Sequence, residues 1–194
     1  PIFRPGAGDE DSDIDSYLII GSKASDDSTT DAQYPANQDQ KFVGDNRDNI
    51  LLGLAKSDTL LGNNGADSLY GGDGGDRLDG GDGNDHLYGS QDNNTDTYVI
   101  SKGQDVFFDF KLDSDLIEFD GRARDLRFAP TQYGSGAELI DSTLITIIDG
   151  DKQGSTAILV GVTPEEFLGH QPYPPIVGPI DPDEGETDDN GNPI

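Results

Sequence analysis

A glycine- and aspartate-rich stretch with a nine-residue period constrains this chain more than any other feature. Three units follow one another without a gap from Gly62 to Tyr88, and each reads Gly-x-x-Gly-x-Asp-x-Leu-x. The leucine of this pattern recurs every nine residues over five units, at Leu51, Leu60, Leu69, Leu78 and Leu87. A disordered linker has no reason to keep a leucine at a fixed period, so the pattern predicts a repeat architecture.

The order of residue types within each unit predicts one turn followed by one short strand. Side chains alternate between the two faces of a strand, so the leucines should point inward while Ser68, Arg77 and His86 point outward. Two units then complete one coil of a parallel β-roll, and units n and n+2 stack on the same side. A core one leucine wide is too thin to offset the loss of chain entropy.

The turn of each unit carries the residue types that a calcium site requires. Ca²⁺ binds roughly six to eight oxygens from carboxylates and carbonyls. Glycines at the first and fourth positions allow φ > 0 and turn carbonyls toward one point, and the aspartate at the sixth position supplies charge. The predicted metal ligands are Asp58, Gly62, Asn64, Gly65, Asp67, Gly71, Asp73, Gly74, Asp76, Gly80, Asp82, Gly83, Asp85 and Asp96.

Stacking of alternate units should arrange the sixth positions in two rows. Asp58 then faces Asp76 on one flank, and on the other flank Asp67 and Asp85 follow Asn49, which stands in the ligand place of its unit. Ions between stacked turns would take oxygens from both turns. Because leucine burial alone is insufficient, we expect folding to require the metal.

Both ends of the repeat region depart from the pattern. Units 44–52 and 53–61 carry Asn49 at a ligand position and Lys56 at a glycine position, so we expect an N-terminal cap that keeps the coil but loses affinity. Residues 11–22 begin like an EF-hand loop but lack its turn glycine and final glutamate, which favours a solvated acidic linker. The acidic cluster at 181–192 is either an isolated calcium loop or an unstructured tail.

Residues beyond 100 alternate short apolar runs with Gly, Asp and Ser turns, which predicts a β-sandwich-like cap. A short helix should follow, with Thr163 as N-cap, Pro164 at the first position and Glu166 closing a capping box. The predicted fold class is all-β: a parallel β-roll of nonapeptide repeats with a β-sandwich-like C-terminal region and one short helix. The expected segments are irregular N-terminal residues 1–42 that pack on the roll, the roll over 43–100, the cap over 101–169 and a Pro-rich, acidic tail over 170–194.

The repeats resemble the RTX (repeats-in-toxin) calcium-binding nonapeptide, because spacing and residue type agree at every defining position. The following region resembles the C-terminal part of serralysin-type proteases and the R-modules of alginate epimerases, in residues 96–100, 105–110, 115–119 and 158–162. Together the likeness covers residues 44 to about 169. It implies several bound Ca²⁺ ions, export in an unfolded state by a type I pathway, and folding outside the cell.

Composition excludes several other functions. The 39 acidic and 12 basic residues give a formal charge of −27, so nucleic acid and anionic membranes are poor partners. The chain has no Cys for a disulfide or a cysteine zinc site, and no apolar run long enough to be inserted into a membrane. With only His86 and His170, the H-E-x-x-H zinc motif is absent, and we predict no catalytic residues.

Two functions agree with these observations. The first is a non-catalytic extracellular calcium-binding module of a larger adhesin, matrix or surface-layer protein, with other protein subunits or a cell-surface polysaccharide as candidate partners. The second is the C-terminal folding, secretion or substrate-binding module of a secreted protease, lipase or polysaccharide-modifying enzyme. A subunit of an ordered assembly is a weaker third.

Three tyrosines of the repeat region have two interpretations. Tyr70, Tyr88 and Tyr98 either form an exposed strip for sugar stacking or, as we prefer, pack against the cap.

Overall fold

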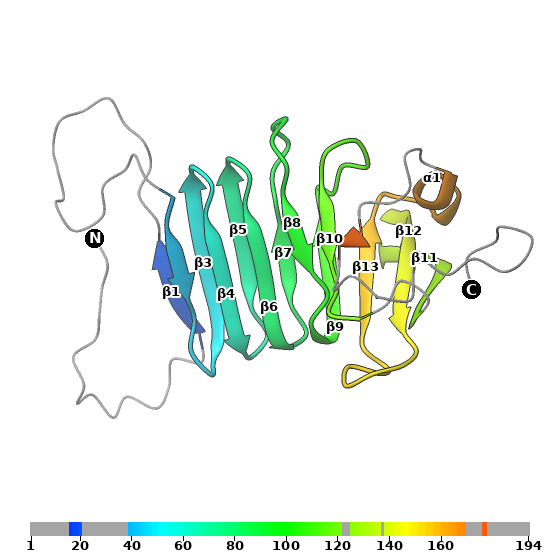
Figure 1. Cartoon of the computed structure of the whole chain (residues 1–194), viewed down its shortest axis with the longest axis horizontal. Helices are drawn as coiled ribbons and strands as arrows, with labels where there is room; N and C mark the ends of the chain where they lie inside the picture. The colour runs from blue at the N-terminus through cyan, green and yellow to red at the C-terminus, as the bar shows by residue number, and fades with distance from the viewer. Residues whose placement is uncertain (1–15, 21–38, 122–124, 137, 170–175, 178–194) are drawn as a thin grey trace, which may run out of the picture.

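The computed structural model describes residues 16–20, 39–121, 125–136, 138–169 and 176–177. The described chain is a parallel β-roll followed by a smaller region of antiparallel strands and one helix (Figure 1). None of the helical residues in these ranges forms a segment long and apolar enough to cross a membrane. The EF-hand-like stretch lies mostly outside the described residues, as do the acidic cluster and most of the tail.

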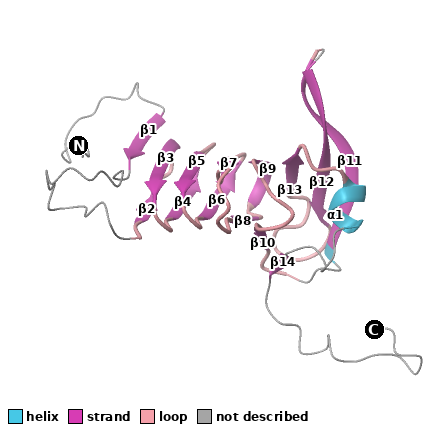
Figure 2. Ribbon diagram, turned by 90° about the horizontal axis from the view of Figure 1, so that it is seen from above, coloured by secondary structure: helices cyan, strands magenta, loops and turns pink. Residues whose placement is uncertain are grey.

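The strands of the roll alternate between two parallel sheets (Figure 2). Sheet A contains β1 (Ser16–Ile20), β3 (Asp48–Ala55), β5 (Ser68–Asp73), β7 (His86–Tyr88) and β9 (Lys102–Phe108). Sheet B contains β2 (Lys41–Val43), β4 (Thr59–Asn64), β6 (Arg77–Gly83), β8 (Thr97–Val99), β10 (Leu116–Glu118) and β14 (Ile176–Val177). The two sheets join where β6 pairs with β9.

The register confirms that units n and n+2 stack. Leu51 pairs with Leu69 in sheet A, and Leu60 pairs with Leu78 in sheet B, an offset of 18 residues in each case. The offset becomes 20 where Leu78 pairs with Tyr98, because the loop before β8 is longer than the turns of the regular repeats. The coil therefore tolerates extra residues in a turn without losing its inward column.

The core is a single column of apolar side chains between the two sheets. All five leucines of the repeat are fully buried, as predicted from strand alternation. Ser68 and Arg77 are half-buried and His86 is exposed on the outside. Other apolar residues continue the column at both ends: Phe42, Tyr98, Phe107 and Ile117.

Parallel pairing extends past both expected limits of the roll. β2 pairs with β4 from residue 41, and Phe42 stands nine residues before Leu51. Beyond residue 100, β9 and β10 pair in parallel with β7 and β8. We therefore propose that the roll covers residues 41–118 and not 43–100. Aromatic and β-branched residues replace leucine in these coils, which hides them from a search for the leucine period.

The region after the roll extends sheet A. β13 (Thr156–Val160) pairs in parallel with β9, and β12 (Glu138–Ile147) and β11 (Leu126–Ser135) continue from it in antiparallel order. The helix α1 (Pro164–Gly169) contacts β11 and β12 of this extension. The buried ring of Phe167 holds the helix there, 6.4 Å from the ring of Phe110 and 5.3 Å from that of Phe128.

The helix begins as its sequence predicts. The backbone N–H of Thr163 donates to Oε2 of Glu166 at 2.9 Å, and the N–H of Glu166 donates to Oγ1 of Thr163 at 3.3 Å. These reciprocal bonds form the expected capping box and satisfy donors that a helix start would otherwise leave free. At the N-terminal side, β1 pairs in parallel with β3, so residues 16–20 form a strand within the segment that was expected to be irregular.

Candidate calcium-binding turns

The sixth-position residues form two hydrogen-bonded ladders, one on each flank of the roll. In each ladder, the backbone N–H of one residue donates to Oδ1 of the carboxylate one coil further on. Asp58 donates to Asp76 at 2.7 Å. On the other flank, Asn49 donates to Asp67 at 2.6 Å, and Asp67 donates to Asp85 at 2.7 Å. These are the pairs expected from the stacking of alternate units.

In five of the ladder carboxylates, the second oxygen has no hydrogen-bond partner among the residues that the structure describes. Oδ2 is buried and accepts no hydrogen bond in five residues: Asp58, Asp67, Asp76, Asp85 and Asp96. Each of these residues is at most 2% exposed. A buried carboxylate oxygen without a donor is strongly unfavourable unless a proton or a cation neutralises it.

Burial changes the acidity of the ladder. It raises the pKa of Asp76 and of Asp85 to about 7, and that of Asp58, Asp67 and Asp96 to about 6. The N–H groups that donate to Oδ1 act in the opposite direction, and neighbouring carboxylates add to the rise. Near neutral pH, protons therefore compete with any cation for these oxygens.

The glycines of the turn have two separate roles. A Cβ atom added to Gly62 would overlap both Oδ2 of Asp67 and the carbonyl oxygen of Gly80. The first-position glycine is thus required for close approach. The expectation that its φ is positive is wrong, because the left-handed residues are at the second and fourth positions instead: Gly65, Gly72, Gly74, Gly81 and Gly83. The fourth position behaves as predicted.

The same close approach gathers oxygens from two stacked turns. Asp67 Oδ2 belongs to the unit of Gly62, whereas the Gly80 carbonyl belongs to the unit one coil further on. At Gly53, Oδ2 of Asp58 and the carbonyl of Gly71 approach in the same way. A carboxylate and a carbonyl oxygen are the donors that a hard cation such as Ca²⁺ binds, so these residues fit calcium.

Comparison with known proteins agrees with this geometry. Residues 43–78 and 61–96 match the family model of the RTX calcium-binding nonapeptide repeat (4 copies). Residues 43–96 are RTX repeats. Such repeats bind several calcium ions per module. No curated protein sequence matches the chain. Among solved structures, the AlgE6R3 subunit of the mannuronan C5-epimerase from Azotobacter vinelandii is 24% identical, with a TM-score of 0.42, over 72% of this chain and 77% of its own.

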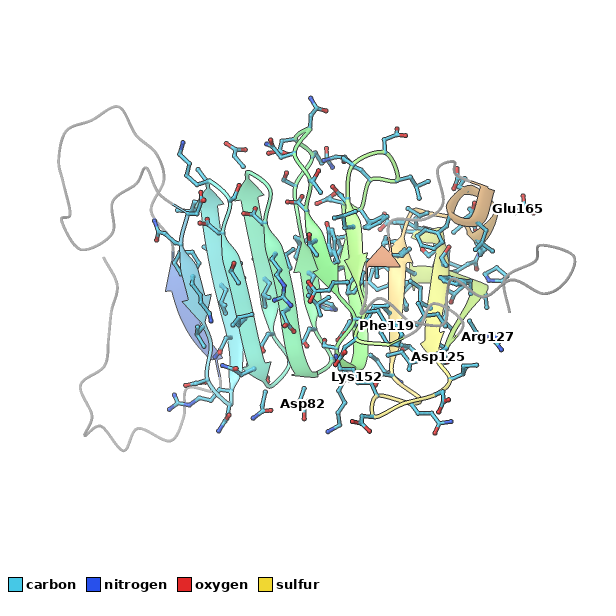
Figure 3. The ribbon with its side chains drawn as sticks, in the orientation of Figure 1. Asp82, Phe119, Asp125, Arg127, Lys152 and Glu165 are labelled. Carbon is cyan, nitrogen blue, oxygen red and sulfur yellow. The ribbon has the colours of Figure 1, made fainter. Side chains whose placement is uncertain are left out.

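The predicted ligand residues of the RTX roll divide into two groups. The sixth-position aspartates line the ladders, whereas the third-position side chains Asn64, Asp73 and Asp82 are exposed. Asp82 pairs with Lys102 at 3.0 Å and lies at the edge of the roll (Figure 3). We therefore propose the sixth-position carboxylates as side-chain ligands and expect the other positions to contribute only backbone oxygens.

The proposed backbone ligation agrees with a further observation. Among the residues that the structure describes, no three His, Asp or Glu side chains gather at one point. The RTX turns instead bring one carboxylate per turn to an oxygen-rich backbone.

Each ladder contains one further aspartate that the nonapeptide pattern did not predict. The N–H of Asp85 donates to Oδ1 of Asp105, and the N–H of Asp96 donates to Oδ1 of Asp115, both at 3.2 Å. Their Oδ2 atoms do have protein partners, since Ser101 Oγ donates to Asp105 at 2.8 Å and the Lys111 N–H donates to Asp115 at 2.8 Å. Both residues would be found by a pattern that asks for an aspartate two positions before any apolar residue, and not only before a leucine.

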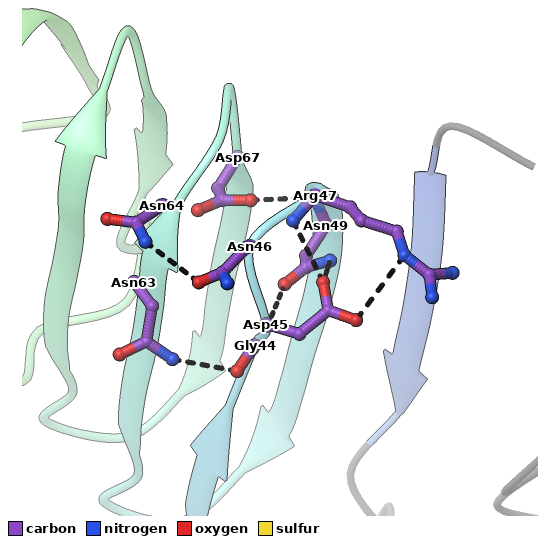
Figure 4. A network of polar contacts seen from close by, with 8 residues as sticks. All are labelled: Gly44, Asp45, Asn46, Arg47, Asn49, Asn63, Asn64 and Asp67. Carbon is purple, nitrogen blue, oxygen red and sulfur yellow. Dashed lines mark hydrogen bonds and ion pairs between the residues drawn. The ribbon is translucent and has the colours of Figure 1, made fainter. Parts of the chain in front are cut away.

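The N-terminal turn of the RTX roll is also closed by protein groups (Figure 4). The amide of Asn49 accepts from the N–H of Asp45 at 2.7 Å and donates to Oδ1 of Asp45 at 3.2 Å. Arg47 lies 3.7 Å from the same carboxylate, and Asn63 Nδ2 donates to the carbonyl of Gly44 at 2.7 Å. The side-chain oxygen of Asn49 approaches Gly44 as Oδ2 of Asp67 approaches Gly62, but here it accepts a hydrogen bond from the N–H of Asp45.

Proposed function

We propose that this chain is an extracellular calcium-binding module whose RTX roll folds when calcium binds, as a non-catalytic part of a larger secreted or cell-surface protein. The observation that carries the proposal is the set of five buried Oδ2 atoms that accept no hydrogen bond from the described part of the chain. They lie in the segment that matches the calcium-binding repeat. Calcium supplies, when bound, the divalent charge that these carboxylates need.

The protein's own groups prepare the carboxylates for this role. Each backbone N–H fixes one oxygen of the next carboxylate on its flank, which leaves the second oxygen directed at the first-position glycine. Asp58, Asp67, Asp76 and Asp85 would hold the ions together with carbonyl oxygens of the stacked turn, whereas the Asp96 carboxylate is close enough to feel the positive charge of Lys111. The leucine column sets the spacing between coils, and therefore between ligands.

The charge of the chain couples folding to calcium. Two rows of buried carboxylates within a chain of net charge −27 repel one another and oppose compaction. At the low free calcium of a cell interior the roll would stay open, which suits export by a type I pathway, and millimolar calcium outside would close it. We therefore propose that the module functions after secretion.

The aromatic residues support packing over sugar stacking. Tyr70 stacks on Tyr88 at 4.5 Å, and Tyr88 stacks on Phe108 at 4.4 Å, so the Tyr88 ring is packed between two others, whereas Tyr70 is 38% exposed. Tyr98 is fully buried, and its hydroxyl donates to the Phe108 carbonyl at 2.6 Å. A polysaccharide partner would need a different surface, whereas a protein partner remains compatible with the fold.

Far-UV circular dichroism of the full chain tests the proposal. We expect little β-structure through the roll in EGTA and a cooperative gain of β signal as Ca²⁺ rises toward millimolar concentration. Mg²⁺ at the same concentration is the control, because its preference for octahedral water-rich coordination suits these carbonyl turns poorly. An unchanged spectrum between EGTA and calcium would contradict the proposal.

The module of a secreted enzyme remains the second interpretation. It shares the same calcium-dependent folding and differs only in the activity of the parent polypeptide. The complete reading frame distinguishes the two, since the second requires a catalytic domain in the same polypeptide.

A further inference from the structure

A lysine side chain closes the C-terminal end of one flank of the roll. The turn 89–96 stacks on the turn 71–76, with Ser90 and Asp92 standing 18 residues after Gly72 and Gly74. Gly74 confirms this stacking, because its N–H donates to Oδ2 of Asp92 at 2.9 Å. The ammonium group of Lys111 donates to the carbonyl oxygens of Ser90 and Asp92 at 2.6 and 2.5 Å.

Lys111 reaches this turn from the next coil on the same flank. Its backbone N–H donates to Oδ2 of Asp115, the ladder residue that follows Asp96. One residue thus satisfies the last carboxylate of the ladder with its N–H and binds the preceding turn with its ammonium. The positive charge lies between two stacked turns, and it binds the carbonyls of the turn residues that correspond to the left-handed glycines of the regular repeat.

We infer that the Lys111 ammonium takes the place of a calcium ion between the turns 89–96 and 110–115, so that this end of the roll carries a covalently attached cation. An ammonium group has three donors and no acceptor, and so it suits carbonyl oxygens. Unlike a free ion, it is always present and needs no calcium in solution. This inference rests on the proposed placement of calcium between stacked turns.

The other flank ends in a similar way, which supports the inference independently. Lys152, from the loop between β12 and β13, donates its ammonium to the carbonyl of Ile100 at 3.1 Å. Figure 3 shows Lys152 at the edge of the roll beside the last coils. Ser101 satisfies the second oxygen of Asp105 on the same flank. We therefore expect the coils after residue 89 to be ordered at lower calcium than the coils before it.

Charge reversal at Lys111 tests the inference. Lys111→Glu replaces the ammonium with a calcium ligand, so this variant should bind one more Ca²⁺ per chain than the wild type at saturation, measured by equilibrium dialysis. Lys41→Glu is the matched control, because Lys41 is exposed on β2 and has the same change in charge; its stoichiometry should equal the wild type. A folded Lys111→Glu variant with the wild-type number of ions would overturn the inference.

A second variant decides the matter if Lys111→Glu does not fold. Lys111→Gln replaces the ammonium with a neutral, shorter side chain, and hydrogen exchange of amides 89–96 in saturating calcium should become at least about tenfold faster than in the wild type. Unchanged exchange in that turn would overturn the inference. A wild-type chain that binds no calcium would instead refute the proposed function, so the two failures are distinguishable.

Discussion

The interior turns of the RTX roll and its two ends share one backbone coil but neutralise their polar groups differently. In the interior, Asp67, Asp76 and Asp85 each keep a buried oxygen with no hydrogen-bond partner in the described residues. At the ends, the equivalent oxygens are satisfied by the Asn49 network, by Ser101 and by the backbone of Lys111. We therefore expect calcium dependence to be a property of particular turns and not of the coil as a whole.

The largest effect is expected from a comparison of two glycines with similar φ, one in an interior turn and one outside the roll. Gly81, in an interior turn, has φ = 94°, and Gly150, in the loop after β12, has φ = 90°. A Cβ atom at Gly81 would overlap the Asn63 carbonyl, whereas one at Gly150 meets nothing within 4 Å. Gly81→Ala should therefore cost about 3 kcal/mol or more, and Gly150→Ala only about 1 kcal/mol.

Chemical denaturation at saturating calcium, followed by circular dichroism, measures both glycine variants. Equal losses for the two would show that coil stacking adds nothing to the conformational strain. A larger loss at Gly150 would contradict the close packing of the interior turns altogether.

Exchanging the ladder residues between interior and end should transfer calcium affinity. Asp76→Asn removes a buried charge, so calcium affinity should fall about tenfold or more, while the metal-free chain becomes more structured because a neutral amide costs less to bury. Asn49→Asp should show a smaller change in the opposite direction. Calorimetric titration with Ca²⁺ measures the first effect, and circular dichroism in EGTA measures the second. If Asp76→Asn weakens the metal-free fold, the carboxylate is not the destabilising group.

Acid should partly replace calcium in the interior turns. Because burial raises the pKa of Asp76 and Asp85 to about 7, above the ordinary aspartate value of 3.8, protonation stabilises the metal-free fold. That stabilisation is complete below about pH 4 and is lost as pH rises through 6 to 7. We expect the metal-free chain to gain β signal between pH 8 and pH 5, and its calcium affinity to fall over the same range. A metal-free spectrum that does not change with pH would rule this out.

The smallest expected effect concerns the ion pair that links an interior strand to the last coil. Arg77 on β6 donates from Nε and Nη2 to both carboxylate oxygens of Glu118 on β10, at 2.9 and 2.7 Å. Both side chains are about one-third exposed, so Arg77→Gln should cost no more than about 1 kcal/mol. The loss should shrink at high salt. Glu118→Gln should lose a similar amount, and the double variant should lose less than the sum.

Much of the interior could be predicted because it depends on short-range pattern. The period of nine and the alternation of strand side chains determine the inward leucines, the pairing of Asp58 with Asp76, and the exposure of His86. The capping box at Thr163 is equally local. None of these requires knowledge of residues outside the repeat or the helix itself.

The positions of the roll's ends could not be predicted in the same way. Tyr98, Phe107 and Ile117 occupy the leucine column without repeating leucine, and two extra residues before β8 break the count. The roles of the glycines were also partly misassigned, since the sequence shows two glycines together but not which one turns the backbone. The first glycine of each pair is required because it lies against a carboxylate, and the second because its backbone has a positive φ.

The sequence by itself determined the coil, its leucine column and the calcium-binding character of its turns, because a fixed period imposes the same local geometry on every unit. Only the tertiary structure decided which carboxylate oxygens keep no partner and which are satisfied by the protein. Those partners come from the neighbouring coil, as Lys111 does for Asp115 and for the turn 89–96, or from the strands beyond, as Lys152 does for Ile100. A hydrogen bond between different coils depends on how the coils stack, which no single unit of the sequence contains.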